Sequence, residues 1–380
     1  MESAHPQPVH TLYGGAHLFT PDAVAKVRRV AKGTLAEYGT ADWLEGPCKE
    51  AVTALLNARL DARPVDDQRI DFEDGYGPRG DEEEDGHAKA AALGVAEALR
   101  ANALPPLLGI RVKSFGPATR RRAERTLATF FGALGKASPA ALPPRFVVTL
   151  PKVTGEDEVR AFVSATDAAV SGAGLPRDAL RFELMVEHPA ALLDEEGRVP
   201  LRRFARALGE RAFAFHLGAY DLTAELGVSA VSQRLDHLHL DVARTTMLLA
   251  LAGTGIPVVD GATTRLPVVL HKAPANEAER AENQRSVASA LRLHAGHVRR
   301  ALDAGIHQGW DLHPAQLLAR YGALYTYYLE NEATMRARQV RFAESRAQAT
   351  RVGALFDDAA TARAVDDFFV RGAACGAFAS

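Results

Sequence analysis

Three acidic residues lie close together in the stretch RIDFEDGYG, which begins at residue 69. Asp71, Glu73 and Asp74 end a strand-like run and directly precede a Gly-Tyr-Gly turn. A carboxylate buried without a partner costs several kcal/mol or takes up a proton. The cluster therefore needs a cation, a metal ion or a proton in the folded protein. Each acid is a candidate general base or a group that orients metal-bound water; alternatively, the acids hold an arginine or backbone amides.

Two further carboxylates follow successive apolar runs, Glu187 in LMVEHP and Asp221 in GAYDLTAELG. Two carboxylates that meet in the fold repel each other unless a cation lies between them. Oxygen ligands with open positions suit Mg²⁺ or Mn²⁺, which keep several waters and accept substrate oxygens. The pair therefore predicts a divalent metal site. Helix caps or salt bridges at strand ends are the alternative.

Basic side chains end three more runs of the same kind. Arg111 ends LLGIR, and its guanidinium can hold a substrate carboxylate through two parallel hydrogen bonds. Asp71 or Glu73 could equally be its partner, and both roles are compatible if the acids orient the arginine. Lys152 in LPKV and His313 in WDLHP are expected to contact substrate. A structural hydrogen bond is the alternative role of His313.

These residues follow a repeating pattern of strand-like runs separated by segments with helical spacing. Strand starts lie roughly 30 to 57 residues apart, which suits strand–helix units better than hairpins. Eight units predict a (β/α)₈ TIM barrel over residues 1–318, followed by a C-terminal helical extension over 319–380. A doubly wound open sheet is the alternative fold. The runs are 11–18, 68–74, 107–115, 145–153, 180–187, 212–221, 257–264 and 305–314.

Alternation within the runs predicts which side chains face the interior of the barrel. Ile70 and Phe72 share one face, whereas Asp71 and Glu73 share the other. Chemistry in this fold takes place at the carboxyl ends of the strands. Because at least five runs end in a charged residue, we expect one shared site there. The acidic run DEEED at 81–85 is expected to be the solvated first turn of a helix.

Composition narrows the class of protein. The chain has 380 residues, of which 47% are apolar and 24% charged, and its formal net charge is −2. This balance gives no argument for nucleic acid or a membrane surface as partner. Two cysteines, Cys48 and Cys375, exclude a disulfide framework and a thiolate zinc site. With neither a signal-like start nor an apolar run of membrane-spanning length, a soluble cytoplasmic protein is expected.

Seven of these stretches, in order, resemble the citrate lyase β-subunit-like family, the HpcH/HpaI aldolase group of the phosphoenolpyruvate/pyruvate-barrel superfamily. The likeness covers about residues 11–320. Lys113 stands where that family has asparagine, and Asp311 replaces a small residue, so the chain resembles a divergent branch. The matching stretches are IDFEDGY, GIRVKS, LPKV, LMVEHPAAL, GAYDLTAELG, VVDG and WDLHPAQL.

The resemblance implies the same barrel and assigns roles to the matching residues. Glu187 and Asp221 would be the metal ligands and Arg111 the grip on a carboxylate or keto-acid group. The acids of the IDFEDG stretch would lie under the metal, where related aldolases place their proton-transfer group. The implied reaction cleaves or forms a carbon–carbon bond in a hydroxy acid or its coenzyme A thioester, through an enolate held by Mg²⁺ or Mn²⁺.

The sequence therefore predicts a Mg²⁺- or Mn²⁺-dependent carbon–carbon lyase of the aldolase type. Its expected partners are a small keto or hydroxy acid, or an acyl-coenzyme A, and further copies of itself in a homo-oligomer. One alternative is a metal-dependent thioester hydrolase on the same barrel. Another is a protein that binds a keto acid without turnover, which the Lys113 and Asp311 departures keep open.

Overall fold

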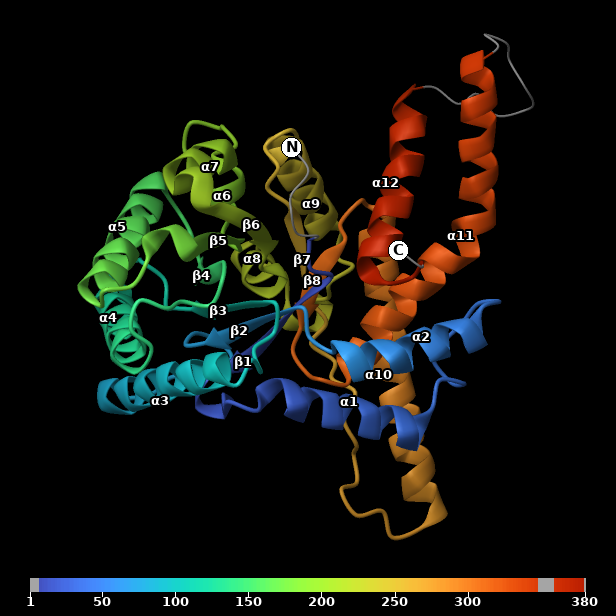
Figure 1. Cartoon of the computed structure of the whole chain (residues 1–380), viewed down its shortest axis with the longest axis horizontal. Coiled ribbons are helices and arrows are strands. Elements are labelled where there is room, and N and C mark those ends of the chain that lie inside the picture. The colour runs from blue at the N-terminus through green and yellow to red at the C-terminus, as the bar shows by residue number, and fades with distance from the viewer. Residues whose placement is uncertain (1–6, 348–358, 379–380) are drawn as a thin grey trace.

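The computed structural model describes residues 7–347 and 359–378. Its centre is a closed barrel of eight parallel strands in sequence order, with β8 paired to β1 (Figure 1). The predicted TIM barrel is confirmed, and the open-sheet alternative is excluded by this closure. The strands are β1 His10–Gly15, β2 Asp67–Asp71, β3 Leu107–Arg111, β4 Phe146–Leu150, β5 Leu180–Val186, β6 Ala212–Leu217, β7 Val258–Ala262 and β8 Gln308–Asp311.

Helices alternate with the strands and surround the barrel. Within the described residues, no helix is both long and apolar enough to cross a membrane. The helices are α1 Ala23–Tyr38, α2 Lys49–Ala62, α3 Asp81–Arg100, α4 Arg120–Ala137, α5 Glu156–Gly172, α6 Pro189–Leu192, α7 Leu201–Leu208, α8 Ala219–Glu225, α9 Leu238–Leu251, α10 Glu277–Asp303, α11 Gln316–Ala347 and α12 Ala359–Cys375.

Strand β2 shows how the alternating sequence builds two layers. All five of its residues are buried. Ile70, and Phe72 just after the strand, join the apolar core between barrel and helices, where the Phe72 ring meets Phe130 of α4 edge to face. Asp67, Arg69 and Asp71 occupy the alternate positions. The predicted alternation is therefore confirmed for this strand, with apolar side chains outward and charged ones inward.

The inward charges neutralise one another in an ionic network. The Arg69 guanidinium pairs with Asp67 of its own strand and with Glu183 of β5, and all three are fully buried. Thr149 donates a hydrogen bond of 2.8 Å to Glu183, and His216 Nε2 lies 3.2 Å from the same carboxylate. Burial raises the pKa of Glu183, but Arg69 and His216 outweigh it and hold that pKa below its ordinary value.

The acidic run at 81–85 forms the start of α3, as predicted, and acids there complement the helix dipole. The expectation that the whole turn is solvated is wrong for Glu84, which is fully buried. Its carboxylate accepts a 2.7 Å hydrogen bond from Lys113 and a 2.6 Å hydrogen bond from Thr126. Glu84 thus ties α3 to α4 and to the segment after β3.

Helix α11 belongs both to the barrel and to the C-terminal segment. Its first half supplies core residues, including Leu317, Tyr321 and Tyr328, and its second half leaves the barrel beside α12 (Figure 1). The Tyr321 hydroxyl donates a 3.1 Å hydrogen bond to the Pro64 carbonyl, just before β2. The predicted division between residues 318 and 319 falls within this helix, and the two-domain description stays a prediction.

We predict that Arg69→Met lowers the free energy of unfolding by about 3–5 kcal/mol, because it leaves Asp67 and Glu183 buried without their shared cation. Urea denaturation measures the loss. A matched control is Arg160→Met, which breaks an exposed ion pair with Glu156 within α5 and is expected to cost less than about 1 kcal/mol. Equal losses in the two variants would contradict the argument.

Candidate active site

The carboxyl ends of strands β2 to β6 bring most of the predicted site residues together. Asp71 ends β2 and Arg111 ends β3, and the strand register sets the two residues opposite each other. Lys152 follows β4 and Glu187 follows β5. Asp221 lies in the first turn of α8, directly after β6. The expectation of one shared cluster at this end of the barrel is thus met by these residues.

Asp71 and Arg111 form a two-pronged ion pair. Arg111 Nε donates to Asp71 Oδ1 at 2.6 Å, and Nη2 donates to Oδ2. Both carboxylate oxygens also accept backbone hydrogen bonds, from Glu73 N at 2.9 Å and Gly75 N at 2.8 Å. Asp71 is therefore fully engaged in holding the guanidinium and the turn that follows β2. This arrangement suits an orienting role better than proton transfer.

The other edge of the Arg111 guanidinium faces the remaining acids. Nη1 lies 3.2 Å from Glu73 and 4.0 Å from Asp74. The guanidinium also lies over the Tyr13 ring, 5.0 Å from its centre. Burial lowers the pKa of Arg111, but Asp71 outweighs it and raises that pKa well above its ordinary value. Arg111 therefore presents a fixed positive charge of which one edge is not engaged by Asp71.

Lys152 connects the acids from three strands. Its ammonium contacts Glu73, lies 3.0 Å from Asp74 and lies 3.5 Å from Asp221. Its backbone amide donates a 2.6 Å hydrogen bond to Glu187 Oε1. The backbone has φ +52°, in the left-handed region that residues other than glycine rarely adopt. Strained backbone of this kind is concentrated at functional sites.

Glu187 is buried at 2% exposure, and its environment favours the neutral form. Burial raises its pKa to about 8; Lys152 opposes this shift and Asp221 adds to it. Gly218 is needed beside it, because a Cβ there would lie 2.3 Å from Glu187 Oε2. Glu187 is thus a carboxyl group packed in a confined position where additional positive charge would stabilise its ionised form.

The pKa values of Glu73 and Asp74 are shifted in opposite directions although the two residues are neighbours. Burial raises the pKa of Glu73 above its ordinary value, against Arg111 and Lys152. For Asp74, hydrogen bonding with Glu73 and the charge of Lys152 outweigh burial, so its pKa is lowered. Its side chain is also 56% exposed. Of these two neighbouring acids, Glu73 is therefore the better suited to exchange a proton.

The donor set fits a divalent cation of the magnesium type. Glu187 and Asp221 offer carboxylate oxygens from adjacent strands, and Mg²⁺ is commonly held by one or two carboxylates together with waters and substrate oxygens. Within the described ranges, no three His, Cys, Asp or Glu side chains are grouped to hold a metal alone. Such a cation would share the acids with Lys152, whose ammonium lies among them.

His313 occupies a different position from the cluster. It follows β8, and its Nδ1 accepts a 3.2 Å hydrogen bond from Ala315 N at the start of α11. Burial lowers its pKa, which favours the neutral ring. Its hydrogen bonds within the described chain are local to this turn, as the structural alternative expected. A substrate-binding role for His313 stays a prediction.

Lys113 and Asp311, the two residues that depart from the family pattern, form hydrogen bonds with different parts of the structure. Lys113 donates 2.7 Å hydrogen bonds to the Phe72 carbonyl and to Glu84, so it braces α3 beside the strand ends. Asp311 accepts from Arg320 and lies 2.8 Å from His294, whose other ring nitrogen lies 2.8 Å from Thr263. The sequence did not predict this buried series of hydrogen bonds, because its histidine lies on α10 and a lone histidine in a helix gives no sign of its partners.

The comparisons with known proteins give a family for the chain. A family model described as "Domain of unknown function (DUF6986)" matches residues 2–380. The chain belongs to the DUF6986 family. Among curated proteins, none matches this DUF6986 chain.

Solved structures share the fold of the DUF6986 chain at low sequence identity. A Haloferax volcanii malate synthase in a magnesium/glyoxylate complex is 16% identical with a TM-score of 0.51, covering 94% of this chain and 80% of its own. The same enzyme in a pyruvate/acetyl-CoA ternary complex is 14% identical with a TM-score of 0.53, covering 85% and 70%. These likenesses establish the barrel fold only.

An HpcH/HpaI aldolase from Desulfitobacterium hafniense is also similar to the DUF6986 chain. It is 13% identical with a TM-score of 0.41, covering 87% of this chain and 93% of its own. This score is too low to carry an argument. The citrate lyase β-subunit-like branch expected from the motifs therefore stays a prediction.

The raised pKa of Glu187 predicts a pH dependence of stability in metal-free protein. The folded state holds this proton up to about pH 8, whereas the unfolded chain loses it near the ordinary value of 4.5. Stability contributed by the neutral carboxyl is therefore lost as pH rises from about 4.5 to about 8. We expect wild-type protein to lose stability relative to Glu187→Gln across this window.

Urea denaturation in a metal chelator at several pH values measures this difference. The matched control is Glu225→Gln on α8, an acid whose side chain is 55% exposed, and it should follow the wild-type profile. If the free energies of unfolding of wild type and Glu187→Gln differed by the same amount at every pH, the pKa of Glu187 would be unshifted and the prediction would be contradicted.

Proposed function

We propose that this protein is a Mg²⁺- or Mn²⁺-dependent enzyme that forms or cleaves a carbon–carbon bond next to a keto-acid or acyl group, through an enolate. The observation that carries the proposal is the cluster at the ends of β2 to β6. It combines a fixed guanidinium, a lysine and a pair of carboxylates suited to a divalent cation. This combination suits a substrate with a carboxylate next to a carbonyl.

In the proposed site, Arg111 binds the carboxylate of the substrate. Its guanidinium is rigid because Asp71 takes one edge, and planar forks of this kind bind carboxylates with two parallel hydrogen bonds. Nη1 lies on the edge toward Glu73, so the substrate carboxylate would approach there. Lys152 adds a second positive charge on the same side and would help to balance the negative charge of the substrate.

Glu187 and Asp221 are proposed to hold the metal ion. The bound cation would stabilise the negative charge that develops on the enolate oxygen. Glu73 is proposed to move the proton between the substrate carbon and the protein, because its pKa is raised and it lies beside the substrate-binding edge of Arg111. Asp71 acts through Arg111 and is a positioning residue.

The solved neighbours support this proposal at the level of ligand chemistry. One malate synthase structure is a magnesium/glyoxylate complex, and another is a pyruvate/acetyl-CoA ternary complex. These are small keto acids, a divalent cation and a coenzyme A thioester, as the motif resemblance also implies. We therefore include an acyl-coenzyme A thioester among the proposed substrates. The homo-oligomer and the cytoplasmic location stay predictions.

The decisive experiment is calorimetric titration of metal-stripped protein with pyruvate, oxaloacetate and glyoxylate. We expect binding only after Mg²⁺ or Mn²⁺ is restored. Arg111→Lys should abolish it, because lysine keeps a charge beside Asp71 but lacks the guanidinium fork. Arg125→Lys is the matched control, since Arg125 lies on α4 with a half-exposed side chain paired to Asp85. Keto-acid binding that is the same without metal and in Arg111→Lys would contradict the proposal.

Product analysis separates the proposed reaction from thioester hydrolysis on the same metal site. Incubation of metal-loaded protein with a keto acid and acetyl-CoA should give a new carbon–carbon-bonded acid that mass spectrometry identifies. Release of free thiol and acetate alone would favour the hydrolase. Tight keto-acid binding with no product from any substrate would favour a binding protein.

We predict that Asp221→Ala abolishes metal binding while the fold stays intact, because Asp221 lies on a short surface helix and its side chain is 40% exposed. Titration with Mn²⁺ measures the metal, and circular dichroism checks the fold. Glu225→Ala, four residues later on α8, is the control and should bind Mn²⁺ like the wild type. Unchanged affinity in Asp221→Ala would remove this residue from the site.

A further inference from the structure

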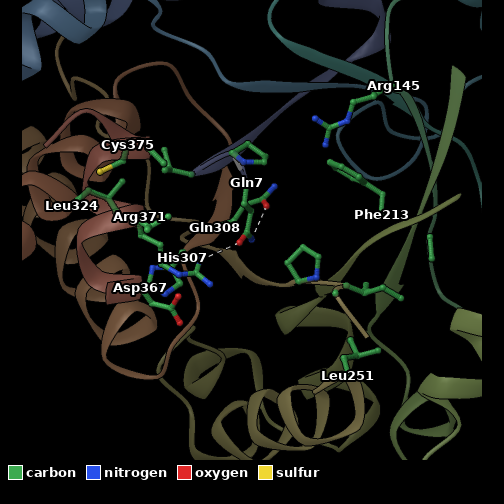
Figure 2. Close-up of a pocket in the computed structure, with 18 of the residues that line it drawn as sticks. Gln7, Arg145, Phe213, Leu251, His307, Gln308, Leu324, Asp367, Arg371 and Cys375 are labelled. Carbon is green, nitrogen blue, oxygen red and sulfur yellow. Dashed lines mark hydrogen bonds between the residues drawn. The ribbon is translucent and has the colours of Figure 1, made fainter. Parts of the chain in front are cut away.

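A large cavity lies at the opposite end of the barrel from the cluster described above. Its volume is about 900 Å³, within the range of small-molecule sites. Arg145 directly precedes β4, Phe213 lies at the start of β6, and Gln308 begins β8, so the cavity opens at the amino ends of the strands. Residues of α12, including Arg371, form another wall (Figure 2).

Two arginines face this cavity from different elements. Figure 2 shows Arg145 beside Phe213 on one side, with Arg371 near His307 and Asp367 on the other. Arg145 lies over the Phe213 ring at 5.1 Å, and Arg371 donates a long 3.4 Å hydrogen bond to Gln7. Among residues 7–347 and 359–378, neither guanidinium forms an ion pair. Half-buried guanidinium groups without a carboxylate favour an anion.

The two glutamines that line the cavity already have hydrogen-bond partners. Gln7 donates a 3.1 Å hydrogen bond to Gln308 (Figure 2). Gln308 in turn donates a 2.9 Å hydrogen bond to Thr11 inside the barrel. Burial, aided by the charge of Arg371, lowers the pKa of His307 to about 3, so this ring is neutral. The fixed positive charge facing the cavity therefore comes from the two arginines.

The remaining walls are largely apolar. Phe213, Leu251, Tyr328 and Val370 are among the residues that line the cavity, and Asp367 is the acid among them. An inorganic anion would leave most of this volume and apolar surface without contact. A longer molecule with an anionic group at each end would meet both arginines and cover the apolar walls.

We propose that this cavity is a second binding site, for an organic acid with two anionic groups joined by an apolar chain, held between Arg145 of the barrel and Arg371 of α12. The site is separate from the candidate active site, because it opens at the amino ends of the strands and the acids of the IDFEDG stretch lie at the carboxyl ends. A ligand bound in this way would fasten α12 to the barrel. The proposal does not depend on the proposed function.

Titration of the full-length protein with succinate, adipate, suberate and azelate tests the site. A chelator is present throughout, so that metal-dependent binding at the candidate active site does not contribute. One dicarboxylate length should bind best, and more tightly than the monocarboxylate of equal length. Arg145→Gln and Arg371→Gln should each lower the affinity for that ligand by roughly tenfold or more, because each removes a charge-assisted hydrogen bond.

Two controls make the result specific. Arg363→Gln removes an exposed arginine from the same helix, α12, and should leave the affinity unchanged. Arg111→Lys should also leave it unchanged, because Arg111 lies at the other end of the barrel. Binding that is insensitive to Arg145 and Arg371, or is weakened equally by Arg363→Gln, would overturn the proposal. So would the absence of dicarboxylate binding, or equal affinity for dicarboxylates and their matched monocarboxylates.

Discussion

The buried pairing of Asp71 with Arg111 is the contact on which the candidate site depends. A closed barrel excludes water from its interior, so each charge that points inward must meet an opposite charge there. The pair meets this requirement where β2 and β3 end, and Asp71 also holds the turn that carries the next two acids. Glu73 and Asp74 therefore take their positions from the same contact that fixes the guanidinium.

The charged side chains inside the barrel form two groups, one around Arg69 and one around Lys152, that differ in how acids and bases are paired. Around Arg69, two buried acids share one guanidinium and Thr149 donates a further hydrogen bond to Glu183, which suits a structural role. Around Lys152, acids from several strands share one flexible ammonium, and Glu187 keeps a raised pKa. In this second group the acids outnumber the basic side chains. Uncompensated negative charge at the carboxyl end of a barrel is what a site for a metal cation requires.

Alternation along the strands was enough to predict the barrel and the inward direction of Asp71, because one face of each strand must meet the helices. The same alternation points Arg69 inward, but its partner Glu183 is far away in the chain and could not be assigned from sequence. Glu84 escaped prediction for a similar reason, since an acidic first turn gives no sign that a neighbouring helix will cover it. No local sequence pattern predicts the cavity that Arg145 and Arg371 line, because the two residues are far apart in the chain.

Helix α11 connects the barrel with the C-terminal segment. Its first turns fill the barrel core through Leu317 and Tyr321, while its later turns support α12, which walls the cavity at the amino ends of the strands. The barrel core and one wall of the cavity therefore share a single helix. Truncation within the first turns of α11 would therefore remove Leu317 and Tyr321 from the core and, together with α12, a wall of the cavity.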